Sequence, residues 1–422
     1  MYFSLSPKQR EVVDYIETGK NVFVTGPAGT GKSFLLHYLK NEYMEKGLHI
    51  TASTGIAAVN IGGSTLHAWA ALGIGNIPLN EMLRWAFSKS GTKLRKKIRT
   101  AKMLAIDEIS MISAELFDLL NEYLKAIRDS TEPFGGLQLI LFGDFLQLPP
   151  VADENELHFC FESQAWQEGR FKTIILDEIF RQDDKRFIEL LNNIRFGRIT
   201  RDDIEILRTR YNIRDDNSII KATILSTHNA SVLNTNNKEL SLLSAREMIY
   251  KAKFVGDEKK VIFLKSACIA QELLTLKVGA QVMMLKNTYA KDGIINGSVG
   301  IVKDFSIAKN YPIVEFTNGT VITVTPEEWV LERFDYNEGK VIVDAKMTQI
   351  PLSLAWAITV HKSQGMTLDK IECDLANAFA DGQIYVALSR VKSLKGLFIK
   401  SFNVNKIKAN NKIISFYKDF EQ

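Results

Sequence analysis

Eight residues near the amino terminus constrain the fold of this chain more than any other feature. They follow the apolar run 21–25, precede the amphipathic stretch 33–45 and fit the pattern G-x-x-x-x-G-K-[ST]. Between a strand and a helix, such a turn surrounds phosphate oxygens with backbone N–H groups. This context favours a nucleotide-binding loop over a chance glycine-rich turn, with Lys32 reaching the β- and γ-phosphates and Ser33 holding Mg²⁺. The loop consists of Gly26, Pro27, Ala28, Gly29, Thr30, Gly31, Lys32 and Ser33.

An acidic pair follows another apolar run. Asp107 and Glu108 come directly after residues 102–106. In P-loop enzymes an aspartate at this place holds Mg²⁺, and an adjacent glutamate polarises the attacking water. The alternative is two solvated carboxylates at a strand end. Together with the phosphate loop, however, the pair indicates nucleotide hydrolysis rather than nucleotide storage.

A third strand, predicted at 137–142, leads into the segment 143–150. Its Gln147 is a candidate to hydrogen-bond a γ-phosphate or the attacking water and so to report the state of the nucleotide. A tight turn shaped by Gly143 and the two prolines accounts for the same segment equally well. The spacing alone does not separate these interpretations.

The alternation of strands and helices predicts an α/β fold. In the first half, apolar runs at 21–25, 48–52, 102–106 and 137–141 each lead towards a helical stretch, which is typical of a parallel sheet covered on both faces. A similar pattern resumes from residue 172 onward. We therefore expect two α/β domains in tandem, the later strands being 172–176, 222–226, 281–285 and 395–400.

Two stretches depart from this pattern. Residues 82–106 contain eight Lys or Arg and no Asp or Glu. Residues 297–347 read as short strands separated by Asn-Gly and Glu-Gly turn signals. Each is predicted to be an insertion into its host domain, the first basic and helical, the second all-β.

Composition narrows the class of protein further. With 422 residues, 46% of them hydrophobic and 24% charged, the chain is typical of globular proteins, not of disordered or fibrous ones. Its three cysteines are too scattered for a zinc site or a disulfide framework, so we expect reduced thiols in a cytosolic or nucleoplasmic protein. We expect no signal peptide and no membrane span. A net charge of +4 permits a polyanionic partner.

The order of these motifs resembles superfamily 1 DNA helicases. Further matching segments are Ser-Thr-Gly-Ile at 53–56, Phe-Arg-Gln at 180–182, Thr-Val-His-Lys-Ser-Gln-Gly at 359–365 and Tyr-Val-Ala-Leu-Ser-Arg at 385–390. The segment 133–149 is similar to the PIF-type branch, which is known for 5′-to-3′ helicases. The resemblance extends from residue 5 to about residue 400.

The resemblance implies two RecA-like P-loop domains with ATP between them and single-stranded DNA across their top. It implies a minimal bacterial or phage-type core that is monomeric when free of DNA, placed in the bacterial cytoplasm, or in the nucleus or mitochondrion of a eukaryote. The family also implies roles in repair, recombination or telomere maintenance. The predicted parts are a first domain at 1–64 and 101–177, a basic wedge insertion at 65–100, a second domain at 178–296 and 348–422, and an SH3-like β insertion at 297–347.

The resemblance adds residues to the nucleotide site. Gln9 would select adenine through its amide, and Arg181 and Arg390 would come from the second domain to the γ-phosphate, where guanidinium groups stabilise the charge of phosphoryl transfer. Gly365 would let the backbone approach the nucleotide closely. The alternatives are a surface glutamine and ordinary arginine salt bridges. The catalytic set is thus Glu108, Lys32, Gln147, Arg181 and Arg390.

The same resemblance places a DNA track over both domains. Hydroxyl groups, main-chain N–H groups and cations serve the phosphates of a single strand. For the two histidines the alternative is a structural, hydrogen-bonded role. The residues assigned to the strand are Thr54, Gly55, Thr65, His67, Thr359, His361, Lys362 and Ser363.

The basic run 93–99 is interpreted as a phosphate footprint, with Lys93 and Lys96 as DNA contacts and a solvated helix face as the alternative. Trp85 or Phe87 is a candidate for a wedge that parts the duplex, although an aromatic residue at this place is more often part of a core. Trp356 is predicted to pack rather than to stack on bases.

These features predict an ATP-dependent 5′-to-3′ helicase that uses Mg²⁺ and binds single-stranded DNA and junctions between single and double strands. The polarity, like any action on G-quadruplexes or RNA–DNA hybrids, rests on the resemblance alone. One rival is a P-loop ATPase that loads or remodels nucleoprotein complexes without unwinding. Another is an ATP-dependent switch that grips DNA without moving along it.

Overall fold

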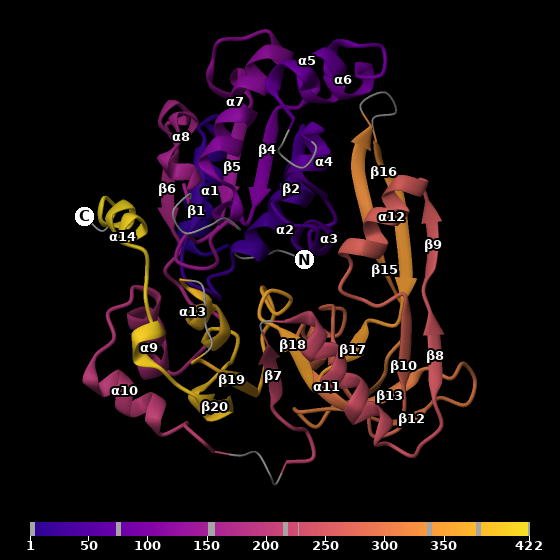
Figure 1. Ribbon diagram of the computed structural model, residues 1–422. Coiled ribbons are helices and arrows are strands. Elements are labelled where there is room, and N and C mark those ends of the chain that lie inside the picture. Colours follow the sequence, from indigo (N-terminus) through magenta and orange to yellow (C-terminus); the bar gives the residue numbers. More distant parts are fainter. Residues whose placement is uncertain are drawn as a thin grey trace.

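The computed structural model describes residues 5–72, 77–150, 157–213, 218–226, 228–335, 340–376 and 381–420. A six-stranded parallel sheet forms the first unit, in the order β3-β2-β4-β5-β1-β6 (Figure 1). Its strands are β1 Val22–Thr25, β2 Leu48–Ala52, β3 Ser64–Thr65, β4 Met103–Asp107, β5 Gln138–Phe142 and β6 Lys172–Ile175.

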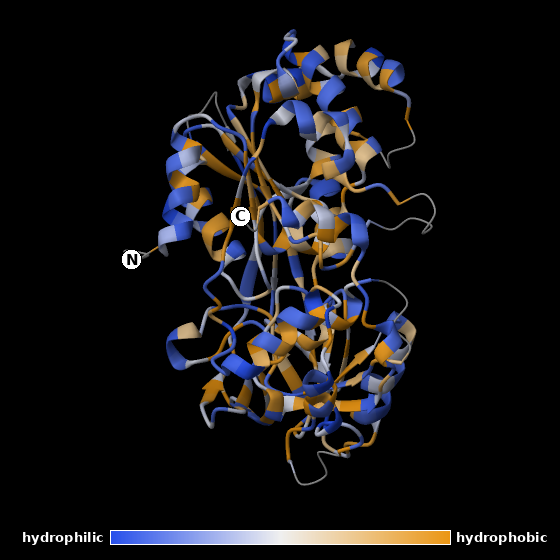
Figure 2. Ribbon diagram, turned by 90° about the vertical axis from the view of Figure 1, so that its left-hand side faces the viewer, coloured by the Kyte–Doolittle hydropathy of each residue, from blue (hydrophilic) through white to orange (hydrophobic). Residues whose placement is uncertain are grey.

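Helices cover both faces of this sheet because successive side chains of each strand point to opposite sides. Val22 and Val24 pack with α1–α3, whereas Phe23 packs with α4–α8 on the other face. In Figure 2 the central strands are mostly orange, and the helices around them carry blue residues. The helices of the unit are α1 Pro7–Glu17, α2 Lys32–Tyr43, α3 Gly55–Asn60, α4 Leu66–Ala70, α5 Leu79–Phe87, α6 Thr92–Thr100, α7 Ala114–Arg128 and α8 Gln164–Gly169.

A second parallel sheet, in the order β18-β7-β19-β20, forms the core of the other α/β unit. The predicted tandem α/β architecture is thereby confirmed. The strands are β7 Thr223–Ser226, β18 Ala357–Thr359, β19 Ile371–Asp374 and β20 Leu397–Ser401. The helices of this region are α9 Lys185–Arg195, α10 Arg201–Arg208, α11 Asn229–Ser241 and α13 Gln383–Leu388. Short 3-10 turns lie at Ile109–Met111, Pro133–Gly136, Cys160–Glu162, Ala290–Asp292, Leu394–Gly396 and Val404–Lys406.

Antiparallel sheets occupy the rest of the second half, in the orders β14-β13-β12-β11-β17, β15-β16-β9 and β10-β8. They extend on both sides of the predicted insertion at 297–347, and the exact boundaries of the parts remain a prediction. The elements are β8 Met248–Lys251, β9 Lys253–Gly256, α12 Glu258–Ala267, β10 Leu273–Leu276, β11 Gln281–Met284, β12 Val299–Phe305, β13 Pro312–Phe316, β14 Val321–Thr323, β15 Glu327–Asp335, β16 Lys340–Gln349 and β17 Leu352–Leu354.

One strand assignment was wrong. The run 281–285 was expected in the second parallel sheet, but β11 pairs antiparallel with β12 and β17. All four residues of β11 are buried. A strand covered on both faces is continuously apolar whichever direction its neighbours run, so the pattern could not separate the two kinds of sheet.

The carboxyl-terminal helix α14, Asn411–Lys418, returns to the first unit. Its Ile413 and Tyr417 belong to the core that contains Phe23 and Phe145, and Figure 1 shows the yellow helix beside α8 and β6. The prediction had placed this stretch in the second domain. Among the described residues, no helix combines the length and apolar character needed to cross a membrane.

Candidate nucleotide and nucleic-acid sites

The backbone of the phosphate loop requires glycine. Gly26 and Gly31 have φ values of 141° and 84°, in a region that other residues rarely adopt. An added Cβ would lie 2.3 Å from the carbonyl oxygen of Leu176 at Gly26, and 2.7 Å from Gln9 Nε2 at Gly31. The loop thus follows the edge of its own sheet at one end and touches α1 at the other.

Lys32 begins α2 and folds back over the loop. Its Nζ donates to the carbonyl oxygens of Gly26 at 2.7 Å and Pro27 at 2.9 Å. Burial lowers the pKa of Lys32 to about 8, while the carboxylate of Asp144 opposes this shift. The ammonium group is held by neutral carbonyls at the loop, where the charged phosphates of a nucleotide are its better partners.

The acidic pair lies at the carboxyl end of β4. The backbone N–H of Glu108 donates to Asp107 Oδ1 at 3.0 Å. Burial raises the pKa of Asp107 to about 6, and burial together with Asp107 raises the pKa of Glu108 to about 8. Glu108 has φ 53° and ψ 46°, a left-handed conformation that costs free energy in a non-glycine residue.

The position of Gln9 excludes a simple surface role. Gln9 lies in the first turn of α1, where its Oε1 accepts from the N–H of Ser6 at 3.0 Å and completes a capping box. The residue is buried, and its Nε2 faces Gly31 of the phosphate loop. A capping box orients the amide, so its NH₂ group is directed towards the nucleotide loop.

Arg181 connects the two units. The N–H of Phe180 donates to the carbonyl of Gly29 at 2.9 Å, so this segment lies on the phosphate loop. The guanidinium extends into the second unit, where it donates to Thr367 Oγ1 at 3.0 Å and to the carbonyl of Ser389 at 2.8 Å. Burial, followed by the charge of Arg390, lowers the pKa of Arg181 to about 9.

Arg390 is buried at the end of α13. Its guanidinium donates to the carbonyl of Val386 and to Ser389 Oγ, both at 2.8 Å, and burial lowers its pKa to about 10. Within the described part of the chain, neither Arg390 nor Arg181 forms an ion pair with a carboxylate. The alternative that these arginines form ordinary surface salt bridges therefore does not hold for either of them. Arg390 is buried and Arg181 is half-buried. Cations in such places without an ion-paired carboxylate are costly, and a bound anion would relieve that cost.

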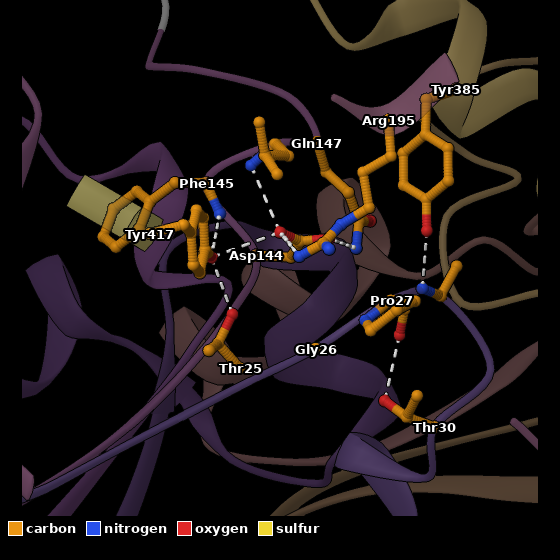
Figure 3. A network of polar contacts seen from close by, with 12 residues as sticks. Thr25, Gly26, Pro27, Thr30, Asp144, Phe145, Gln147, Arg195, Tyr385 and Tyr417 are labelled. Atoms are coloured by element: carbon orange, nitrogen blue, oxygen red, sulfur yellow. Dashed lines mark hydrogen bonds and ion pairs between the residues drawn. The ribbon is translucent and has the colours of Figure 1, made fainter. Parts of the chain in front are cut away.

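Gln147 lies in a network that sequence reasoning missed (Figure 3). Its Nε2 donates to Asp144 Oδ2 at 3.2 Å, and Arg195 from α9 clamps the same carboxylate through Nε at 3.0 Å and Nη2 at 2.8 Å. Burial alone would raise the pKa of Asp144. The Arg195 guanidinium nevertheless holds this pKa below its usual range. Asp144 lies in the segment 143–150 that the sequence singled out, whereas nothing in the sequence distinguished Arg195.

A second contact joins the units at the phosphate loop. The hydroxyl oxygen of Tyr385 accepts from the backbone N–H of Ala28 at 2.8 Å (Figure 3). Tyr385 opens the segment that ends in Arg390, but no role was predicted for it. Gly365, assigned to the nucleotide, is exposed with φ 79° and has open space where a Cβ would lie.

The predicted DNA residues of the first unit cap short helices. Thr54 Oγ1 accepts from the N–H of Ala57, and Thr65 Oγ1 from that of Ala68. His67 is half-buried, and burial lowers its pKa, which favours a neutral ring. A Cβ at Gly55 would lie 2.8 Å from Ala267 Cβ in α12. Helix α12 therefore packs closely against this turn, although Thr54 and Gly55 stay partly exposed.

In the second unit the predicted residues divide into two groups. His361 and Lys362 are exposed. Ser363 is fully buried, and its hydroxyl donates to the carbonyl of Val360 at 2.7 Å. Thr359 is also buried, and its hydroxyl accepts from the N–H of Lys362 at 3.2 Å. The hydroxyls of Thr359 and Ser363 thus stabilise the turn, which does not favour their direct contact with DNA.

The basic run on α6 also divides. Arg95 donates to the carbonyl of Ser88 and Arg99 to that of Ile127. Lys97 donates to the carbonyl of Trp69, and burial lowers its pKa to about 7. These three cations bond to backbone oxygens of neighbouring segments, and the phosphate footprint on this run stays a prediction. Lys93 and Lys96 remain exposed, beside a hollow of about 840 Å³ between α6 and the β15–β16 pair.

The aromatic side chains near this run differ in exposure. Trp85 and Phe87 on α5 are 47% and 50% exposed, which favours a surface role over the core alternative. Trp356 is buried in an apolar cluster with Leu352 and Phe316, as expected for a packing residue.

A P-loop after β1, an acidic pair after β4 and arginines that meet them from a second α/β unit define a P-loop nucleoside triphosphatase of the tandem RecA-like class. The sequence matches PIF1-like helicases over residues 4–205 and the 2B domain of the DNA helicase Pif1 over residues 263–305. The ATP-dependent DNA helicase PIF1 of Danio rerio is 43% identical over 98% of this chain. That of Psychrobacter sp. is 36% identical over 94% of this chain and is covered over 68% of its own length.

Solved structures of Pif1 helicases resemble this chain over nearly its whole length. Unliganded Pif1 from Bacteroides sp. has a TM-score of 0.87 at 32% identity, with 100% of this chain and 98% of that one covered. Bacteroides Pif1 bound to single-stranded DNA has a TM-score of 0.65 at 33% identity, with 99% and 97% covered. The chain belongs to the PIF1-like helicase family. It spans 64% of the length of the Danio rerio relative.

Proposed function

We propose that this chain is an ATP-dependent 5′-to-3′ helicase that moves along single-stranded DNA and unwinds duplex. One observation carries the proposal: the nucleotide loop of the first unit is contacted by residues that the second unit holds, namely Arg181 and Tyr385. A nucleotide bound there is in contact with both units, so its binding and hydrolysis change how they fit together. Two solved Bacteroides Pif1 structures support this proposal: one is a complex with ADP-AlF4, and another is bound to single-stranded DNA.

Each residue of the site has a proposed role. Gln9 selects the base, the N–H groups of the loop and Lys32 hold the phosphates, and Glu108 accepts the proton of the attacking water. Gln147 orients that water or the γ-phosphate. Arg181 and Arg390 stabilise the charge that develops on the transferred phosphoryl group.

Asp107 and Ser33 fit a magnesium site. A hydroxyl and a carboxylate are the oxygen ligands that Mg²⁺ prefers, and Mg²⁺ usually keeps waters and substrate phosphates as its other ligands. Burial raises the pKa of Asp107, and a cation bound beside it would favour its charged form. When bound, Mg²⁺ would neutralise charge on the β- and γ-phosphates.

We further propose single-stranded DNA and junctions between single and double strands as the binding partners. Relatives crystallised with single-stranded and forked DNA support this. The compartment would be one that contains DNA: the cytoplasm of a bacterial or phage-infected cell, or the nucleus or mitochondrion of a eukaryote. Without DNA the chain would be monomeric.

Strand displacement tests the proposal directly. On duplexes that carry a single-stranded tail at either end, ATP should drive unwinding with a 5′ tail, and much less with a 3′ tail. ATP hydrolysis should rise when single-stranded DNA is added. DNA-stimulated hydrolysis without displacement would point instead to a loader or a switch, and displacement from the 3′ tail would reverse the polarity.

The exposed lysines of α6 make a separate prediction. Replacing Lys93 and Lys96 by Ala should weaken DNA binding with little dependence on base sequence. The slope of log K against log salt should become shallower by about 1.4, because each lost phosphate contact on a single strand removes about 0.7. Lys400→Ala with Lys418→Ala, a matched pair of exposed lysines on β20 and α14, is the control. Equal slopes in parent and variant would make α6 a solvated surface.

A further inference from the structure

The carboxyl-terminal helix α14 brings one polar group into the first unit. Tyr417 is 2% exposed. Its ring lies next to Phe416, which packs against Phe145 and Phe161. The hydroxyl lies inside this apolar setting, where a polar group is stable only when it is hydrogen-bonded.

The hydroxyl of Tyr417 uses its full hydrogen-bonding capacity (Figure 3). It lies 2.7 Å from Thr25 Oγ1, accepts from the N–H of Phe145 at 3.2 Å and donates to Asp144 Oδ1 at 3.2 Å. A tyrosine hydroxyl has one proton and two acceptor positions. Because the proton goes to the carboxylate, which only accepts, the Thr25 hydroxyl must donate to Tyr417.

These three partners lie at the base of the two loops that face the nucleotide. Thr25 is the last residue of β1 and directly precedes Gly26. Asp144 and Phe145 open the segment that carries Gln147, and Asp144 also accepts from the Gln147 side chain. The side chain of Thr25 is fully buried, and Tyr417 is its hydrogen-bond partner.

Asp144 gathers side-chain donors from two distant helices and from its own loop. Arg195 comes from α9, Tyr417 from α14 and Gln147 from the loop itself. Arg195 supplies the charge that keeps the carboxylate ionised. Of these donors only Tyr417 also bonds to β1. It thereby reinforces the pairing of β1 with β5 and the bond from the N–H of Gly143 to the carbonyl of Val24, and helps to hold the phosphate loop and the Gln147 segment relative to each other.

We propose that Tyr417 is a positioning residue for nucleotide hydrolysis, and that α14 completes the first unit by joining the bases of the phosphate loop and the Gln147 segment through this hydroxyl. The proposal rests on the assignment of ATP hydrolysis to this site. Tyr417 does not touch the nucleotide. Its contribution is to keep Lys32 and Gln147 in the geometry that the transition state needs, since errors of about 1 Å can cost about 10²-fold in rate.

Tyr417→Phe tests the proposal because it removes the hydroxyl and keeps the ring in the core. With DNA saturating, kcat for ATP should fall about tenfold, while the Kd for a non-hydrolysable ATP analogue stays within about twofold of the parent. DNA affinity without nucleotide should not change. Thermal melting measured alongside shows the fraction folded at the assay temperature, by which each rate is normalised.

Two further variants separate positioning from general packing. Thr25→Val removes the other half of the bond, so kcat of the double variant should resemble that of the poorer single variant rather than the product of both losses. Tyr123→Phe is the matched control, because Tyr123 is a buried tyrosine on α7 whose hydroxyl has no hydrogen-bond partner among the described residues. Its kcat should equal that of the parent.

The possible results decide the matter. A parent protein that does not hydrolyse ATP would overturn the proposed function itself. An active parent with normalised kcat of Tyr417→Phe within twofold, or with losses that multiply in the double variant, would leave the function standing and reduce Tyr417 to a packing residue. A selective, non-additive loss of kcat establishes the positioning role.

Discussion

Glu108→Gln should bind ATP as the parent does and hydrolyse it about 10²–10⁴-fold more slowly, the range that general acid–base catalysis contributes. The amide has the shape of the carboxyl group but accepts no proton from water. Its backbone N–H still donates to Asp107, so the metal ligand should remain in place. Loss of turnover without loss of affinity is the signature of a group that acts in the transition state.

The surroundings of Glu108 support its assignment as the base. Burial and Asp107 raise its pKa to about 8, while the positive charges of Lys32 and then Arg390 act in the opposite direction. The carboxyl group of Glu108 is thus acted on by an acidic neighbour and by two cations. The left-handed backbone at Glu108 is a strained conformation, of the kind that clusters at active sites.

The measurement is single-turnover hydrolysis with DNA saturating, beside equilibrium binding of a non-hydrolysable analogue. Glu115→Gln is a suitable control, because Glu115 is an exposed carboxylate in the first turn of α7. It should hydrolyse ATP at the parental rate. If Glu108→Gln also turned over at that rate, the base would have to be sought elsewhere in the site.

The sequence was most informative where the chemistry is local. The phosphate loop and Asp107–Glu108 are contiguous segments that directly follow apolar strands, and parallel strands bring their carboxyl ends to one edge of the sheet. The pattern alone therefore predicted that the phosphate loop and the acidic pair lie close together. Gln9 required the family resemblance, because a single buried amide leaves no periodic signal.

Contacts that depend on distant parts of the chain were missed for a physical reason. Arg195 and Tyr417 lie on amphipathic helices whose patterns predict burial but not the partner of a polar end group. The bonds to Asp144 span 51 and 273 residues. Nothing in the local sequence of either helix indicates that its side chain will hydrogen-bond to a loop of the first unit.

Counting charges could not separate the cations of α6 from one another, for a related reason. The sequence shows how many cations a helix carries, but not which of them reach back to orphan carbonyls. Arg95 and Lys97 bond to backbone oxygens of neighbouring segments, and their stems cover apolar surface as long cationic side chains often do. The exposure of Lys93 and Lys96 emerges only when the packing of α6 is known.

Loss of either arginine finger should be the second large effect. Arg390→Ala and Arg181→Ala should each lower kcat by about 10³-fold, the lower end of what arginine fingers contribute, and should raise the Kd for ATP far less. Both guanidinium groups bond to Ser389, one to its carbonyl and one to its hydroxyl. Because they share this residue, the double variant should lose less than the product of the single losses.

Lys32→Ala should behave differently, because Lys32 already lies on the phosphate loop before the second unit contributes anything. We expect its Kd for ATP to rise together with the fall in kcat. DNA binding without nucleotide should survive in all three variants, since none of these side chains is assigned to the strand. Arg208→Ala, which removes an exposed arginine of α10 paired with Glu205, is the control and should match the parent.

The contrast between these variants tests the motor itself. If the arginines act only when the two units close on ATP, their loss uncouples binding from hydrolysis, and translocation stops although both ligands still bind. Parental rates in Arg390→Ala and Arg181→Ala would mean that the first unit hydrolyses ATP alone. Closure between the units would then have no chemical consequence, and movement along DNA would need another source of coupling.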